Sequence, residues 1–67
     1  MNAEMLKTEL KKKKLSVEKL AEMAGVHKTT IYRSINGDSK LTVETAKSIT
    51  HALKLKPAAA FSLFFED

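Results

Sequence analysis

The stretch SVEKLAEMAGVHKTTIYRSING, residues 16–37, decides the fold, because it has the pattern of two short helices joined by a tight turn. Ser16 is a good N-cap, since its hydroxyl can accept a hydrogen bond from an unpaired backbone N–H of the first turn. Leu20 and Ala24 fall on one face at helical spacing. Gly25 follows where a reversal of the chain needs a positive φ. The first helix is therefore predicted to end there.

A second helix is predicted over residues 28–36, with Asn36-Gly37 as its terminator. At about 100° per residue, its side chains divide into two sides. The side that can be buried consists of Thr30, Ile31, Ser34 and Ile35. The side left to solvent consists of Lys28, Thr29, Tyr32, Arg33 and Asn36. These solvent-facing groups suit base edges and phosphates, although such a face on an isolated helix is more often only solvated.

Taken together, these residues resemble the lambda-repressor-like family of Cro/XRE-type helix-turn-helix proteins. The resemblance covers roughly residues 4–61. It rests on Leu15-Ser16, Leu20-Ala21, Gly25-Val26, Ile31, Asn36-Gly37, Leu41, Glu44, Ile49 and Ala52-Leu53. It implies an all-α domain of five helices, in which the helix after Gly25 lies in the major groove of DNA with its N-terminal residues on base edges.

The remaining sequence accounts for the other three helices. An amphipathic helix is predicted over residues 3–13, and Thr42 is a suitable cap for a fourth helix. Pro57 suits the first turn of a last helix, because the N–H that proline lacks would be unpaired there. We therefore expect one helix-turn-helix DNA-binding domain over residues 1–67.

Several positions depart from the family's pattern. Leu10 and Ile35 stand where many members have a buried Arg–Glu pair, and two touching aliphatic side chains avoid the desolvation cost of buried charges. Val17 replaces a Gln that contacts a phosphate, so this contact falls to backbone N–H groups or is lost. His27 stands at an N-cap where Ser or Thr is usual. Ser34 stands where an apolar residue is common.

The DNA contacts follow from the resemblance and from the two-sided helix. Lys28, Thr29 and Arg33 are the predicted base readers, because Lys or Arg can pair with guanine O6 and N7 and the Thr methyl can meet a thymine methyl. The predicted contacts to the sugar-phosphate backbone are Ser16, Val17, His27, Tyr32, Asn36 and Lys40. The expected partner is a double-stranded DNA operator, and the expected role is that of a transcriptional regulator, in particular a repressor like the small phage Cro-type regulators.

The C-terminal segment, residues 58–67, contains three of the four aromatic residues. Phe61, Phe64 and Phe65 lie at i, i+3 and i+4, which makes one wide apolar face. We expect Phe61 to close the core. We expect Phe64 and Phe65, with Leu63 at their edge, to form a weak homodimer that DNA stabilises, because one recognition helix reads too few base pairs alone.

Composition limits the other functions. A formal net charge of +4 makes a polyanion a plausible partner. With no Cys, two Gly and no Ser/His/Asp arrangement, we expect no enzyme activity, cofactor or small-molecule ligand. His27 and His51 have no helical pairing with a carboxylate, so no metal site is expected. No apolar run approaches the roughly 18 residues of a membrane helix, so a cytoplasmic protein is expected.

Two alternatives remain open from the sequence. The chain could be a helical protein-interaction module, such as the antitoxin of a toxin pair, whose working surface is the Phe-rich C-terminal helix. RNA binding by base stacking is less well supported, because Tyr32 is the one aromatic residue among basic neighbours.

Overall fold

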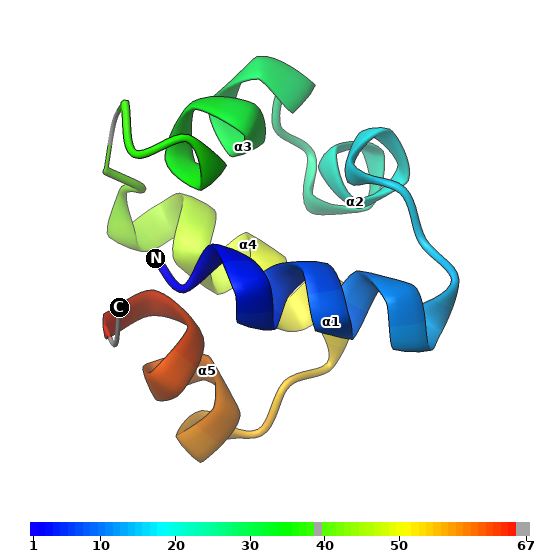
Figure 1. The fold of residues 1–67 in the computed structure, drawn as a ribbon, viewed down its shortest axis with the longest axis vertical. Helices are drawn as coiled ribbons and strands as arrows, with labels where there is room; N and C mark the ends of the chain where they lie inside the picture. The colour runs from blue at the N-terminus through cyan, green and yellow to red at the C-terminus, as the bar shows by residue number, and fades with distance from the viewer. Residues whose placement is uncertain (39, 66–67) are drawn as a thin grey trace.

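The computed structural model describes residues 1–38 and 40–65, and within them the chain forms five α-helices and no strand (Figure 1). The helices are α1 (Ala3–Lys13), α2 (Val17–Ala24), α3 (Lys28–Ile35), α4 (Val43–Leu53) and α5 (Pro57–Phe65). The predicted all-α, five-helix fold is therefore confirmed. In Figure 1, α1 crosses in front of α4, α2 and α3 lie at the top, and the N-terminus lies near the end of α5 at the left.

Each of the first four helices begins at a side-chain cap. In all four, the capping side chain accepts a hydrogen bond from a backbone N–H two or three residues further on, at 3.0–3.1 Å. The caps are Asn2, Ser16, His27 and Thr42. Pro57 is the first residue of α5, as predicted. Single residues therefore set where each helix starts.

Left-handed residues end three of the helices. Gly25, with φ 71°, ends α2 as predicted, whereas α1 and α4 end at Lys14 (φ 57°) and Lys54 (φ 53°). A side chain in this conformation costs about 1 kcal/mol, which glycine avoids. After α3 the left-handed residue is Gly37 (φ 79°), and Asn36 keeps a right-handed geometry (φ −80°). Residue 36 is thus the C-cap of α3, and the helix is one residue shorter than predicted.

All five helices contribute to one core. Its buried residues are Leu6, Leu10, Leu20, Ala21, Ile31, Ile49, Leu53 and Leu63. Complete burial of a Leu or Ile side chain contributes about 1.5–3 kcal/mol. Within this core, α2 packs against both α3 and α4, and α1 packs against α5. The α2–α3 pair is therefore held on a base formed by the other helices.

The inner side of α3 is buried as predicted, and one of its buried residues is polar. Ile31 is fully buried, and Ile35 is partly buried against the core. Ser34 is only 6% exposed, yet its Oγ has no hydrogen-bond partner in the described part of the chain. Burial of an unpaired hydroxyl costs about 1–3 kcal/mol. Leu10 lies in the same core as Ile35, and a direct contact between the two stays a prediction.

Two predictions for α5 are wrong. Leu63, expected at the edge of a dimer interface, is fully buried, and its carbonyl oxygen accepts the N–H of Asn2 at 2.7 Å. Phe61, expected to close the core, is 59% exposed, and its ring centroid lies 5.2 Å from that of Phe65. The side of α5 that faces the core thus contains Leu63 and the partly buried Phe64. Because α5 has apolar residues on all sides, periodicity could not select its inward face.

Candidate nucleic-acid interface

A three-residue turn joins α2 to α3. Gly25 N–H donates to the carbonyl of Glu22 at 3.2 Å, and Val26 N–H donates to that of Ala21 at 3.0 Å, so the end of α2 is closed by its own turn. Val26 is partly buried against the core. His27 then caps α3. With so few residues between the helices, and both helices packed together, the position of α3 is fixed relative to α2.

The predicted DNA-facing side of α3 is open to solvent. The side chains assigned to it are all exposed: Lys28, Thr29, Tyr32, Arg33 and Asn36. Within residues 1–38 and 40–65, neither Lys28 nor Arg33 forms a salt bridge with a carboxylate. Both cations are therefore available to a phosphate or a base edge without first breaking an ion pair.

The basic end of α1 differs in this respect. Lys12 and Lys13 lie 3.8 Å and 3.7 Å from the carboxylate of Glu9 on the same helix. They also lie in the last turn of α1, where cations complement the negative helix end. Lys12 and Lys13 therefore have internal roles that need no phosphate partner. Arg33 also lies in the last turn of its helix, but neither it nor Lys28 is within salt-bridge distance of a carboxylate of the described residues.

Two predicted backbone contacts lie at the start of α2. Ser16 Oγ accepts the N–H of Lys19 at 3.0 Å, which confirms the predicted cap. The Val17 side chain is partly buried against the core. Its side chain is thus turned inward, and a phosphate at this helix end would meet backbone N–H groups. The phosphate contacts themselves stay predictions.

His27 caps α3 through its imidazole ring. Its Nδ1 accepts the N–H of Thr29 at 3.1 Å. A neutral ring that accepts at Nδ1 carries its proton on Nε2, and this N–H is a donor suited to a phosphate oxygen. The unusual cap is therefore compatible with the predicted backbone contact, because the two roles use different ring nitrogens. Asn36 and Lys40, the other predicted contacts beyond α3, are exposed.

A hydrogen bond between α2 and α3 was missed from the sequence. The Tyr32 hydroxyl donates to Oε2 of Glu18 at 2.7 Å. This bond is the main reason why the pKa of Glu18 lies below its ordinary value of 4.5, with smaller contributions from the backbone N–H of Glu18 itself and from the charge of Lys28. The same bond is the main cause that raises the pKa of Tyr32 above 10.0, because the neutral phenol is the donor.

No sequence signal pointed to this pair. From the sequence, Glu18 is an acidic residue in the first turn of a helix, where it complements the positive helix end, and Tyr32 is a solvent-facing residue of the next helix. The two positions lie on different helices, 14 residues apart, so no helical spacing relates them. Their contact depends on the angle between α2 and α3, which a single sequence does not reveal.

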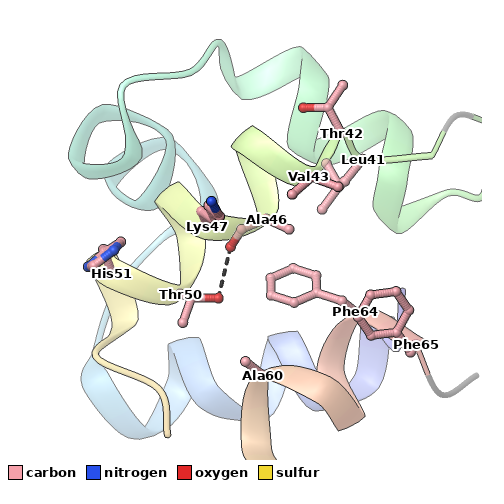
Figure 2. A pocket seen from close by; sticks show the side chains of 10 residues that line it. All are labelled: Leu41, Thr42, Val43, Ala46, Lys47, Thr50, His51, Ala60, Phe64 and Phe65. Carbon is pink, nitrogen blue, oxygen red and sulfur yellow. Dashed lines mark hydrogen bonds between the residues drawn. The ribbon is translucent and has the colours of Figure 1, made fainter. Parts of the chain in front are cut away.

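An apolar groove lies between α4 and α5 (Figure 2). It has a volume of about 300 Å³ and is lined by Leu41, Thr42, Val43, Ala46, Lys47, Thr50, His51, Ala60, Phe64 and Phe65. The Phe64 ring lies between the two helices, and Thr50 donates its hydroxyl to the Ala46 carbonyl at 2.8 Å. Val43 is 72% and Phe65 74% exposed, so the groove has an apolar rim.

The described residues contain no group of three or more His, Cys, Asp or Glu side chains that could hold a metal ion. Among the same residues, no helix has the length and hydrophobicity of a membrane span. The candidate site is the exposed side of α3 with the start of α2, because the cations of α3 are exposed there.

A family model described as helix-turn-helix matches residues 6–59, which is most of the chain. The protein accordingly belongs to the lambda-repressor-like, Cro/XRE-type helix-turn-helix family, as its sequence pattern predicted. No curated protein and no solved structure matches it. Membership in this regulatory family assigns the domain a DNA-binding function of the transcription-regulator type, with double-stranded DNA as its partner.

Proposed function

We propose that the domain is a sequence-specific transcriptional repressor that places α3 in the major groove of a short operator. The observation that carries this proposal is the division of α3 into two sides. Ile31 and Ser34 are buried, whereas Lys28, Thr29 and Arg33 are exposed. The helix is thereby anchored on one side and presents donors on the other.

Lys28, Thr29 and Arg33 are proposed to contact base edges. Lys28 and Thr29 lie in the first turn of α3, the part of a recognition helix that enters the groove most deeply. Arg33 lies one turn further along, where its guanidinium can reach guanine O6 and N7. Within the described residues, neither cation lies within salt-bridge distance of a carboxylate, so neither has to break such a pair to bind DNA.

Residues around these readers are proposed to contact the sugar-phosphate backbone. They are Ser16, Val17, His27, Tyr32, Asn36 and Lys40. Ser16 and Val17 would use backbone N–H groups at the start of α2, and His27 its Nε2 proton. Tyr32 would pack its ring on the groove wall while its hydroxyl stays bonded to Glu18.

The groove between α4 and α5 is proposed to be the interface of a homodimer. In a symmetric dimer the same patch serves both subunits, and the exposed rim residues Val43 and Phe65 form such a patch beside Phe64. Phe61 extends this patch through its contact with Phe65. A stable dimer usually buries about 800 Å² per subunit, more than these few side chains offer, so we expect a weak dimer that two adjacent half-sites stabilise.

The proposal can be tested by selecting bound sites from a random duplex pool and then titrating a selected site and a scrambled one at two salt concentrations. We expect two symmetric half-sites with centres about 34 Å apart. Affinity should fall with salt at a slope of about −0.9 per phosphate neutralised, for roughly four to eight phosphates. Failure to select any motif, with no effect of salt on binding, would contradict the proposal.

A helical protein-interaction module, such as an antitoxin, is the second candidate. The observation that favours it is the exposed aromatic pair Phe61–Phe65 beside the groove. This alternative predicts that substitutions in α5 abolish function while substitutions on the outer side of α3 leave it intact. Repression measured with Arg33→Ala therefore separates the two functions, because the proposed repressor loses activity in this variant and the interaction module does not.

A further inference from the structure

The DNA-facing side of the helix-turn-helix includes a carboxylate that belongs to α2. Glu18 is exposed, and its Oε2 lies 2.7 Å from the hydroxyl of Tyr32 on the outer side of α3. Tyr32 follows Lys28 by one helical turn and directly precedes Arg33. If α3 enters a groove, the bonded Glu18 comes to the DNA with it.

A role at the helix end does not explain this arrangement. Any Asp or Glu in the first turn complements the positive end of α2, and it needs no partner on another helix. Here a side chain of the recognition helix holds the carboxylate instead. The bond restricts two side chains that would otherwise sample several rotamers in solvent, so the position of the carboxylate relative to α3 is defined.

A carboxylate held at a defined position can distinguish base edges that donate hydrogen bonds from those that accept them. It accepts hydrogen bonds and cannot donate them, and it has about four acceptor positions, of which Tyr32 and the backbone N–H of Glu18 use a part. In the major groove, cytosine N4 and adenine N6 carry amino donors. Guanine O6 and N7, thymine O4 and the phosphates are acceptors that a carboxylate repels.

We propose that Glu18 is a specificity-determining residue of the DNA interface: Tyr32 holds its carboxylate at the edge of α3, where it accepts a hydrogen bond from the amino group of a cytosine or an adenine. Sequences that place an acceptor at this point are disfavoured. Tyr32 is then a positioning residue for Glu18. The inference rests on the proposed reading of the major groove by α3.

Nearby charges support this role. Lys28 is close enough to Glu18 for its positive charge to stabilise the carboxylate. The local pair is therefore nearly neutral, and it need not repel the duplex as a whole. The carboxylate then favours a base edge that donates a hydrogen bond over one that accepts it. Discrimination between base pairs requires such a preference.

Three matched variants test the inference. Glu18→Gln keeps the size of the side chain and an oxygen that can accept from Tyr32, but it loses the charge and adds a donor. Tyr32→Phe keeps the carboxylate and removes the hydrogen bond that holds it. Glu22→Gln is the control, because Glu22 lies one turn further along α2 and pairs with Lys19 of the same helix, at 3.5 Å, instead of with α3.

Binding would be measured by competition on duplexes in which each base pair of the selected half-site is replaced in turn by the other three. For the wild type, we expect one position at which a C or an A in one strand is preferred about tenfold. Glu18→Gln should remove a preference for C, and it should change the strength of a preference for A, because Gln can itself pair with adenine N6 and N7. Tyr32→Phe should weaken the wild-type preference, and Glu22→Gln should leave it unchanged. The preferences at all other positions should persist in the three variants.

Two results would overturn the inference while leaving the proposed function intact. One is a Glu18→Gln variant that binds every duplex more tightly by the same factor, since Glu18 would then only repel DNA. The other is an unchanged set of preferences in Glu18→Gln. If the wild type itself shows no base preference at any position, the reading of the major groove by α3 fails, and the inference fails with it.

Discussion

Two short helices of this domain, α3 and α5, use their exposed side chains in different ways. In α3, the exposed side is polar and the buried side is apolar except for Ser34, so burial favours one orientation of the helix. In α5, apolar side chains occupy both the buried and the exposed positions, as Leu63 and Phe65 show. A helix with two distinct sides can be fixed by burial alone, whereas α5 needs its ties to α1 to choose a face.

The comparison has a functional consequence. The exposed side of α3 is polar and carries cations that form no salt bridge with a carboxylate of the described residues, which suits a polyanion. The exposed side of α5 carries aromatic rings, which suit another apolar surface. On the proposed function, the molecule therefore offers two surfaces with different partners, one for DNA and one for a second protein chain.

The sharpest test of the comparison is within α5. Leu63→Ala removes a fully buried side chain and should lower the free energy of unfolding by about 2–5 kcal/mol. Phe61→Ala removes a larger but exposed ring and should change it by less than about 0.5 kcal/mol. Urea unfolding followed by circular dichroism measures both. A larger loss for Phe61→Ala would show that α5 is rotated about its axis relative to this structure.

On the α3 side, Arg33→Ala should weaken binding to the selected operator by about 1–3 kcal/mol and binding to random DNA by much less, because a base contact is lost along with a charge. Lys11→Ala is the control, since Lys11 lies in the last turn of α1, away from α3. Fluorescence anisotropy on both duplexes gives the two affinities. Equal losses on operator and random DNA would make Arg33 a phosphate contact.

The sequence predicted the α3 side well for physical reasons. Ser16, Gly25 and Thr42 each act through local chemistry that a few neighbouring residues determine, and the structure confirms all three. The two sides of α3 were also predictable, because its polar and apolar positions alternate at the helical period. The roles of individual side chains on DNA were not decided by the fold and stay predictions.

What the sequence did not reveal depends on how helices are arranged. The sequence could not decide whether Phe61 or Leu63 is buried, because both are apolar and either could face the core. The Tyr32–Glu18 bond joins two helices whose crossing angle is set by the whole core. Helix α3 ends one residue earlier than predicted. Of the pair Asn36-Gly37, only Gly37 takes the left-handed conformation, and Asn36 is the C-cap.

A further prediction concerns the second surface. Phe65→Ala should leave the free energy of unfolding nearly unchanged, since the ring is mostly exposed. It should reduce cooperative binding to a two-half-site operator by about tenfold, or ~1.4 kcal/mol. Binding to a single half-site should not change. Gel-shift titrations on the two operators give this ratio, and Lys56→Ala, an exposed residue just before α5, is the control. Unchanged cooperativity would place the dimer interface elsewhere.

The smallest expected effect concerns pH. The lowered pKa of Glu18 means that the Tyr32–Glu18 bond stabilises the fold above pH 4.5 and that this contribution is lost as the pH falls through the lowered value. The raised pKa of Tyr32 means that the contribution is present below pH 10.0 and is lost as the pH rises through the raised value. The Tm of the wild type should exceed that of Tyr32→Phe slightly between these limits. A difference that does not vary with pH would indicate that the bond plays no part.

Selection of binding sites with two Lys→Gln variants shows whether the first turn of α3 reads bases while residues beyond its end hold phosphates. With Lys28→Gln, we expect a motif that differs from the wild type at one position of each half-site, because a base contact has been replaced. With Lys40→Gln, we expect the wild-type motif, bound more weakly at every sequence. A motif that is unchanged by Lys28→Gln, or altered by Lys40→Gln, would show that the two lysines do not have these separate roles.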